Sequence, residues 1–443
     1  MTDEQVEGES GPSPRITAWT VGLLCVSVVA SGVIVSGLFH EPQYDLTTAP
    51  TTTRNVTTTA PEPTSTYRTP EVEFPARIPG CATVEPPSGE SRWGSVMGSP
   101  NYDNPDFPWF SARKAVAMSD ALRSALPDGV VLDWGPIDRS LVFEPILGTA
   151  GDEFSGFTHA AAGLRRGELA GSLSLAVRQG PVPVPPCVAG RLDERRVLAD
   201  GTTVDLQDTW SETDGVRTLS RDAIAYRPDG STVSAYSTDA SELGGKPSGT
   251  VPISREELLA LVLTPGVQVA APIPPGTLSS TGACSVGVDD SEPISESVAK
   301  RLDAVLAEIR LDGYTFDRPL AGLRPGEYGP GGLCRSVELS AGGLTSRLTL
   351  SIGAGIALPA TLPADPGSSG RTLPDGSVVQ ATESQGMAMD EPDQAVRVYR
   401  RVAVTRPSGT KIVLDSAASA PAEPLTAAQL ETIALTPGLE VNS

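Results

Sequence analysis

The chain has 443 residues and an excess of acidic side chains, 54 Asp and Glu against 33 Lys and Arg, which gives a net charge of −21. Proteins that bind nucleic acid need clustered positive charge to neutralise phosphates, so this composition argues against a nucleic-acid partner. The length is sufficient for two domains of ordinary size with hydrophobic cores of their own.

Residues 16–39 form an apolar segment without a charged side chain. A helix of this length, at roughly 1.5 Å per residue, crosses a hydrocarbon core about 30 Å thick, so we predict a single transmembrane helix there. Arg15 precedes the segment, and the first lysine or arginine after it is Arg54. The positive-inside rule therefore predicts a short, disordered cytoplasmic tail at residues 1–15 and an extracytoplasmic remainder, so that the protein is placed in the cell membrane.

The same segment argues against a cleaved signal peptide, which has a basic start and a short apolar core, because here the start is acidic and the apolar run is long. Small residues four apart within the run would let two such helices pack closely, so a helix-mediated homodimer is a further hypothesis. These pairs are Ser27 with Ser31 and Gly32 with Ser36.

Residues 40–79 are rich in threonine and are interrupted by proline. A segment of this composition cannot bury a core and stays extended and solvated, so we predict an extracytoplasmic stalk that holds the folded part away from the membrane. Such stalks occur with and without O-linked glycans, and the sequence leaves both alternatives open.

Four cysteines lie beyond the stalk, and none of them has the C-x-x-C spacing of zinc or redox motifs. An even set of this kind predicts two structural disulfides in an oxidising compartment. Four cysteines allow three connectivities. We expect Cys81 to pair with Cys187 and Cys284 with Cys334, because domains that fold as units tend to close their own crosslinks.

Three short motifs occur twice in the same order, which indicates an internal duplication. LADGTTV at 198–204 corresponds to LPDGSVV at 373–379, RPDG at 227–230 corresponds to RPSG at 406–409, and LTPG occurs at both 263–266 and 435–438. We therefore divide the folded part into repeat one (residues 80–271), a proline-rich linker (residues 272–282) and repeat two (residues 283–443).

Each repeat begins and ends with a predicted helix. Ser111 and Ser295 are expected N-caps of the opening helices, and Ser254 with Glu257 and Thr426 with Gln429 form capping boxes before the closing helices. Runs of alternating apolar residues lie between the helices and predict strands, and RPDG and RPSG fit hairpin turns between the last two. The predicted fold is α+β: helix, antiparallel meander of about four strands, helix, in each repeat.

A segment of repeat one without a counterpart in repeat two carries the candidate ligand-binding residues. Aromatic rings beside amide and carboxylate groups are typical of sugar-binding surfaces, and the alternative is that these rings extend the core of repeat one. The candidates are Trp93, Tyr102, Asp103, Asn104, Phe107, Trp109 and Phe110.

Clusters of charge offer weaker hypotheses. The acidic runs at 103–106, 289–292 and 390–393 lack the alternating spacing of an EF-hand loop, so we predict solvated loops and no metal site. Arg397, Arg400 and Arg401 could hold an anionic group, but such residues more often pair with carboxylates across a sheet. The sequence carries no cofactor motif, and we predict no cofactor.

The sequence favours a non-catalytic protein over an enzyme. His159 is the only histidine of the folded part, and no Gly-x-Ser-x-Gly nucleophile motif occurs. We predict a membrane-anchored, extracytoplasmic binding or sensing module of the bacterial cell envelope, with a cell-wall glycan or an envelope protein as partner. The alternative is a membrane-tethered cell-wall hydrolase with a carboxylate or single-histidine site. Only four basic residues are lysine, and the richness in Ala, Gly and Pro resembles single-pass envelope proteins of high-GC Gram-positive bacteria (actinobacteria).

Overall fold

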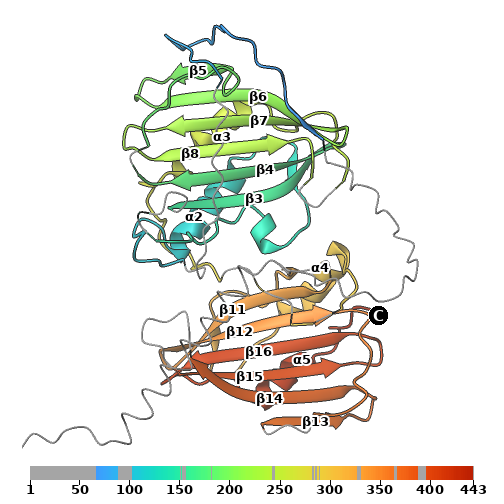
Figure 1. Ribbon diagram of the computed structural model, residues 1–443. Helices are drawn as coiled ribbons and strands as arrows, with labels where there is room; N and C mark the ends of the chain where they lie inside the picture. The colour runs from blue at the N-terminus through green and yellow to red at the C-terminus, as the bar shows by residue number, and fades with distance from the viewer. Residues whose placement is uncertain are drawn as a thin grey trace, which may run out of the picture. The chain divides into compact units, whose positions relative to one another are not determined.

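The computed structural model describes residues 66–87, 102–149, 151, 156–180, 182–241, 245–281, 284, 287–288, 290–326, 331–363, 367–387 and 396–442. Within these residues the protein consists mostly of two antiparallel sheets, with four α-helices (Figure 1). None of the described helices is long and apolar enough to cross a membrane. The expected cytoplasmic tail and transmembrane segment, and residues 40–65 of the expected stalk, lie outside the described part.

Repeat one contains one eight-stranded sheet with the strand order β1-β6-β7-β8-β4-β3-β2, and β5 also pairs with β6. Its elements are, in chain order, β1 (Tyr67–Arg68), α2 (Ala112–Ser124), β2 (Val130–Leu132), the 3-10 helix η1 (Ile137–Arg139), β3 (Phe157–Arg166), β4 (Leu169–Arg178), β5 (Glu194–Val197), β6 (Thr203–Thr213), β7 (Val216–Tyr226), β8 (Thr232–Thr238), α3 (Arg255–Val262) and the 3-10 helix η2 (Pro265–Val267).

Repeat two has the corresponding order when it is read from the opposite edge: β10-β11-β12-β16-β15-β14-β13. β9 also pairs with β11. Its elements are α4 (Glu296–Leu306), β9 (Thr315–Phe316), β10 (Arg324–Pro325), β11 (Leu333–Ala341), β12 (Leu344–Gly353), β13 (Ser368–Thr372), β14 (Val378–Met387), β15 (Val396–Thr405), β16 (Lys411–Ser419) and α5 (Ala427–Ala434). The duplication therefore extends from the sequence motifs to most of the sheet, and β1 has no counterpart among the described strands of repeat two.

The predicted fold class is wrong. It placed a meander of about four strands in each repeat, whereas each described sheet has eight strands and its first hairpin lies beside its last strand, with Leu175 opposite Ala235 and Leu350 opposite Leu414. This pairing joins segments about 60 residues apart. No turn motif marks such a pairing, since it is decided by the packing of apolar faces. The predicted fold class also included a transmembrane helix at residues 16–39, which lie outside the described part, and no described helix could cross a membrane.

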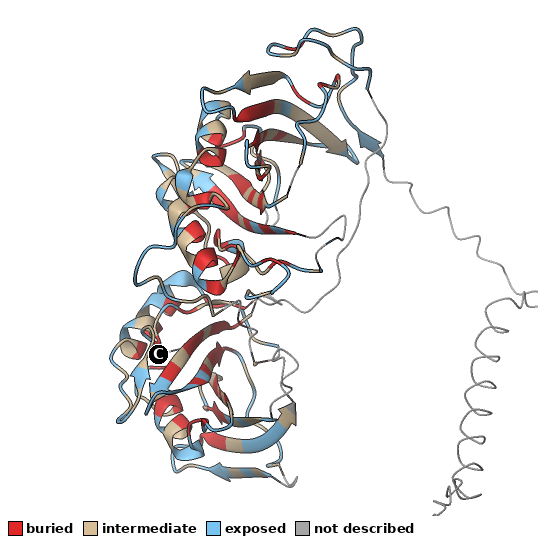
Figure 2. Cartoon of the chain, turned by 90° about the vertical axis from the view of Figure 1, so that its left-hand side faces the viewer, coloured by how far each residue is buried: buried red, intermediate tan, exposed pale blue. Residues whose placement is uncertain are grey.

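The helices of each repeat lie on one side of its sheet (Figures 1 and 2). Buried side chains on the helices and on the facing strands form one apolar core per repeat. The predicted helix starts are confirmed, since Ser111 and Ser295 are N-caps and both closing helices carry complete capping boxes. The residues that flank each box are fully buried: Ile253, Leu258, Leu425 and Leu430.

The duplicated RPDG and RPSG motifs form the predicted turns between β7 and β8 and between β15 and β16. The amide of Gly230 donates to the Arg227 carbonyl at 2.9 Å, and Gly409 does the same to Arg406 at 2.9 Å. Each arginine also donates to the end of the closing helix of its repeat, Arg227 to the Val262 carbonyl and Arg406 to the Ala434 carbonyl. The motif is therefore a structural link between the last hairpin and the closing helix.

Two disulfides join the expected cysteines, Cys81 with Cys187 and Cys284 with Cys334. Structural disulfides form and persist in oxidising compartments. The folded part of this chain is accordingly extracytoplasmic.

Candidate functional site

The helices cover only one face of the sheet in repeat one, and the other face carries a row of polar side chains. Since side chains alternate between the faces of a strand, Gln207, Asp222, Tyr236 and Ser174 share this open face. They come from four neighbouring strands and are paired in register, Gln207 with Asp222, Asp222 with Tyr236, and Tyr236 with Ser174.

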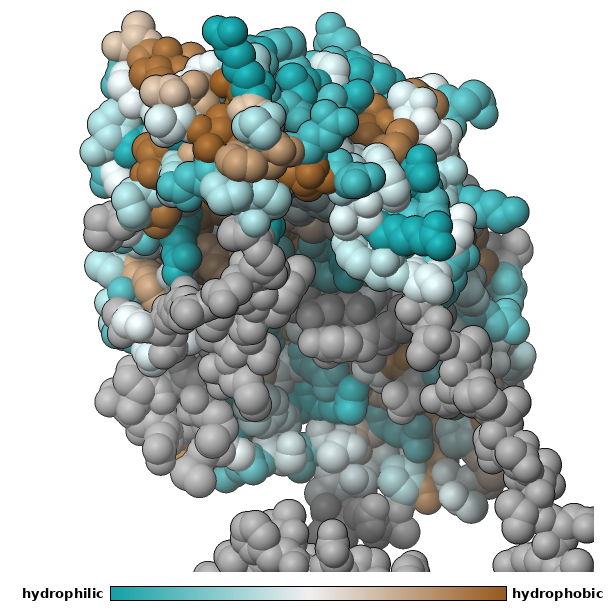
Figure 3. All heavy atoms as spheres, turned by 45° about the horizontal axis from the view of Figure 1, so that its top comes forward, coloured by the Kyte–Doolittle hydropathy of each residue, from teal (hydrophilic) through white to brown (hydrophobic). Residues whose placement is uncertain are grey.

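A segment that we name the strap, residues 66–87, runs beside this part of the sheet and is attached near both ends. At one end Tyr67 pairs with Thr213 of β6. At the other, Cys81 is bonded to Cys187, and Glu85 forms a bridge with Val188. Figure 3 turns the end of repeat one that carries the strap and β5 towards the viewer, and apolar and polar side chains are interspersed on this surface.

A cavity of about 990 Å³ lies between the strap and the sheet, and we name it the strap cavity. Its volume is at the upper end of the range of ligand sites, about 300–1,000 Å³. Five carboxylates, two guanidinium groups and three large aromatic rings contribute to the lining. These are Glu71, Glu73, Asp193, Asp208 and Asp222, then Arg77 and Arg191, then Tyr67, Trp210 and Tyr236. The lining is therefore acidic as well as aromatic.

Asp222 is the half-buried carboxylate of this cavity. Burial, together with the negative charge of Asp208, raises the pKa of Asp222 from 3.8 to about 6. Among the residues that the structure describes, no lysine or arginine forms an ion pair with it. Burial also raises the pKa of Tyr236, which lies opposite Asp222. A positively charged ligand group would gain from this uncompensated carboxylate.

The positions of repeat two that correspond to Asp222 and Tyr236 hold an ion pair. Asp222 precedes the arginine of RPDG by as many residues as Arg401 precedes that of RPSG, and Tyr236 corresponds to Asp415 in the same way. Arg401 pairs with Asp415 across the sheet, with 3.0 Å between Nε and Oδ1. One copy thus holds a neutralised pair where the other holds an acid beside a tyrosine.

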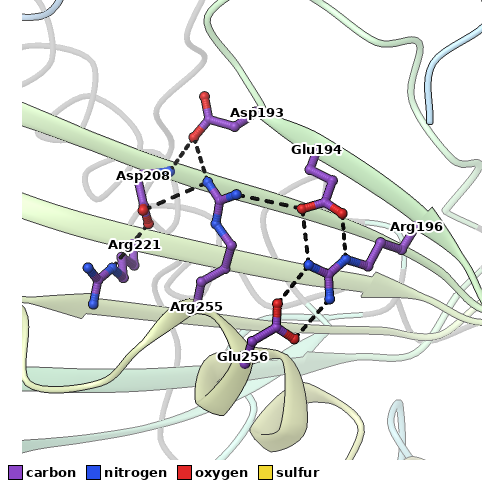
Figure 4. A network of polar contacts seen from close by, with 7 residues as sticks. All are labelled: Asp193, Glu194, Arg196, Asp208, Arg221, Arg255 and Glu256. Carbon is purple, nitrogen blue, oxygen red and sulfur yellow. Dashed lines mark hydrogen bonds and ion pairs between the residues drawn. The ribbon is translucent and has the colours of Figure 1, made fainter. Parts of the chain in front are cut away.

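An ion-pair network fixes two of the other four acids of the strap cavity, Asp193 and Asp208, as Figure 4 shows. Asp208 lies 3.1 Å from Arg221 and 3.8 Å from Arg255, and Asp193 lies 3.1 Å from Arg255. Asp193 also accepts a hydrogen bond of 2.6 Å from the Asp208 amide. The charges of Asp193 and Asp208 are therefore largely compensated, unlike that of Asp222.

The network continues to the closing helix and ties the sheet edge to it. Arg196 of β5 donates to Glu194 at 2.6 Å and to Glu256 of α3 at 2.7 Å (Figure 4). Hydrogen bonds from Arg196 lower the pKa of Glu194. In repeat two, Arg371 and Glu431 pair between β13 and α5 in the same manner. This part of the network is common to both copies and is structural.

The aromatic residues proposed from the sequence lie in and against the core of repeat one. Phe107 and Phe110 are buried, and Tyr102 and Trp109 pack against the same core. The Trp109 and Phe110 rings are 5.3 Å apart, and burial raises the pKa of Tyr102 to about 12. Trp93 lies outside the described residues. The structure brings these four rings together around the opening helix and not at the strap cavity.

The polar candidates of the same segment make local contacts. Asn104 donates to the Gly148 carbonyl at 3.1 Å and accepts from the Asp106 amide at 3.0 Å. Asp103 is exposed. Within the described ranges, no three metal-ligating side chains come together. Asp289 and the run 390–393 lie outside these ranges.

Two of the remaining candidates, His159 and Arg400, lie close to carboxylates. The Nε2 atom of His159 lies 3.6 Å from Glu144. Arg400 pairs with Glu383 at 2.7 Å across the sheet, as the structural alternative expected for this strand.

Sequence reasoning missed Asp222, Trp210 and Tyr236, because they lie inside strands that both copies share. A usable signal exists in the sequence, since counting from the duplicated RPDG and RPSG motifs places Asp222 against Arg401 and Tyr236 against Asp415.

No protein-family model and no curated protein matches this chain. Among solved structures, the chain is similar to MucB in complex with MucA(peri), with 11% identity over 73% of this chain and 97% of that chain and a TM-score of 0.14. It is also similar to the di-domain ARO/CYC StfQ from the steffimycin biosynthetic pathway, with 12% identity over 74% of this chain and 87% of that chain and a TM-score of 0.13. Likenesses at these TM-scores support no functional inference.

Proposed function

We propose that this chain is a non-catalytic binding module of the cell envelope and that the strap cavity of repeat one is its ligand site. The observation that carries the proposal is the contrast between the two copies at one register position. Repeat two closes it with the pair of Arg401 and Asp415, whereas repeat one keeps Asp222 half-buried, without an ion-pair partner among the described residues, beneath a cavity.

The ligand class that this lining favours is a polar molecule of the envelope with at least one positive charge. Glu71, Glu73 and Asp222 add negative potential to the cavity, and Tyr236 offers a ring surface for apolar or cationic groups. The Trp210 ring already carries the Arg217 guanidinium, 3.9 Å from its centroid. A charge-assisted hydrogen bond to a partly desolvated carboxylate contributes more than one in water, about 1.5–3 kcal/mol.

The alternative function, carboxylate-dependent hydrolysis, has weaker support. The raised pKa of Asp222 would suit a general acid, but hydrolysis also needs a second carboxylate as base or nucleophile. Asp208 is the neighbouring acid that acts on Asp222, and two arginines already compensate its charge. Binding is therefore the function that this geometry supports best.

The test is a titration of the full chain with two matched probes. A glucosamine tetramer carries positive amino groups, and its N-acetylated counterpart is neutral. We expect only the cationic probe to change the tryptophan fluorescence, and Asp222→Asn to weaken its binding by about tenfold or more. Glu168→Gln is the control, because it removes one negative charge from an exposed turn.

Equal binding of both probes, or equal affinity of the Asp222→Asn and Glu168→Gln variants for the cationic probe, would contradict the proposed site.

A further inference from the structure

The outer edge of β6 has a gap in its strand pairing beside the strap cavity. β5 pairs with β6 from Thr203 to Leu206, and β1 pairs with it at Glu212 and Thr213. Within the described chain, residues 207–211 have no strand partner on this edge, although they pair with β7 on the other side without interruption. The gap spans about 17 Å at the rise of a strand.

The main-chain N–H and C=O groups of Trp210 face this gap. In an antiparallel strand, alternate residues direct both N–H and C=O to the same edge. The even-numbered residues use the outer edge, since the Leu206 carbonyl accepts from Asp193 at 2.8 Å and the Asp214 amide donates to Thr66 at 2.9 Å. The N–H and C=O of Trp210 therefore face the gap, as does the carbonyl of Asp208, whose amide is already bonded to the Asp193 carboxylate.

Cavities lie on both sides of this edge. The strap cavity is on one side, and a second cavity of about 410 Å³ is lined by Leu219, Arg221 and Val251. Asp208, Thr209, Trp210 and Ser220 line both. Main-chain groups in a strand gap, with space on either side for alternate side chains, are the elements of peptide recognition by strand addition.

We propose that the ligand of the strap cavity is an extended polypeptide segment of another envelope protein, which adds to β6 as an antiparallel strand and carries a lysine or arginine towards Asp222. This inference rests on the proposed function, because it uses the same cavity. Both existing neighbours of this edge, β5 and β1, are antiparallel to β6, so the added strand completes a row. Its residue opposite Trp210 exchanges main-chain hydrogen bonds, and its residue opposite Thr209 points to the open face.

The charge of the cavity decides which residue suits that position. Asp222 lies on the strand next to β6, about two strand spacings or 10 Å from the added strand. The side chains of lysine and arginine are long enough to extend over Thr209 towards it. The excess of carboxylates in the lining disfavours an acidic residue there.

The experiment uses the full chain and a capped pentapeptide with a central lysine flanked by valines, with affinities measured by isothermal titration calorimetry. With the lysine opposite Thr209, the two adjacent valines lie opposite Asp208 and Trp210. Methylation of the main-chain nitrogens of these valines blocks the N–H groups that face β6, and methylation of the main-chain nitrogen of the lysine blocks one that faces away. We expect the first change to weaken binding about tenfold or more and the second to leave it unaltered.

A matched pair of protein variants tests the same contact from the other side. Trp210→Pro removes the edge N–H, which an edge strand tolerates, whereas Trp210→Val removes the same indole and keeps the N–H. We expect the proline variant to bind the peptide more weakly than the valine variant does. Circular dichroism checks that both are folded, and the methylated peptides test the inference even if the proline variant unfolds.

If the valine-methylated peptide binds as tightly as the unmodified one and Asp222→Asn still weakens binding, strand addition is wrong while the cationic site stands. If neither peptide binds and the cationic sugar also fails, both proposals are wrong. Self-association of the chain that Trp210→Pro abolishes, measured by analytical ultracentrifugation, would assign the edge to a second copy and overturn the choice of partner.

Discussion

Replacement of Asp222 by asparagine should stabilise repeat one at neutral and alkaline pH. The folded protein holds this carboxyl at a pKa of about 6, against 3.8 for the exposed group, because burial disfavours its charged form. At about 1.36 kcal/mol per pH unit, this difference corresponds to about 3 kcal/mol of destabilisation when the group is ionised. Since Asp222 is only half-buried, solvent screening reduces this value, and we expect about 1–2 kcal/mol.

The sign of the pH dependence follows from proton binding. Between pH 6 and 3.8 the folded chain holds a proton that the unfolded chain releases, so the wild type gains stability as the pH falls through this interval. Asparagine is neutral at every pH. The advantage of the variant is therefore complete above pH 6 and lost below about pH 4.

Urea unfolding followed by tryptophan fluorescence measures this effect. All five tryptophans precede residue 283, and Trp134 packs against the core of repeat two, so the difference between wild type and variant isolates the contribution of Asp222. Wild type and Asp222→Asn should differ at pH 8 and coincide at pH 4. A variant that is equally or less stable at pH 8 would refute the reasoning, because Asp222 would then make favourable contacts in its ionised form. A gain of stability with a loss of binding is the usual sign of a site selected for function.

Three further predictions follow from single contacts. Peptide affinity should fall about tenfold between pH 7.5 and 5 in calorimetric titrations, because Asp222 with a pKa of about 6 loses most of its charge over this range, and the Asp222→Asn variant should show no such fall. Replacing Cys81 and Cys187 together by serine should cost repeat one about 2–5 kcal/mol in urea unfolding and weaken cavity binding, and unchanged values would show that the strap does not depend on the disulfide. Ser254→Ala should cost about 1 kcal/mol by removing the cap of α3, and a cost below the experimental error in the same assay would contradict the capping-box assignment.

Local signals in the sequence predicted the framework of each repeat. The capping residues Ser254 and Thr426 specify helix starts through contacts within four residues, and RPDG and RPSG specify turns in the same way. The placement of β3 and β4 beside β8 could not be predicted, because it depends on pairing between distant segments whose alternation fits several neighbours. The strand count failed for that reason.

A search for segments that one repeat has and the other lacks could not find the candidate site. The aromatic residues around Trp109 have no copy in repeat two, yet Phe107 and Phe110 are buried in the core and the other described rings pack against it. The distinguishing feature is instead a substitution within shared strands, Asp222 in place of Arg401. Its meaning depends on the strap, which the composition of residues 40–79 predicts as solvated stalk and which lies beside β6 from Thr66 onward.

Amide hydrogen exchange of the full chain, with and without the central-lysine pentapeptide, tests the central claim most directly. If the strap cavity is the ligand site, protection should increase in residues 207–213 and in the strap, above all at the amide of Trp210, while the amides of residues 102–110 and of repeat two keep their rates. Protection confined to residues 102–110 or to repeat two, with the strap and β6 unaltered, would contradict the account.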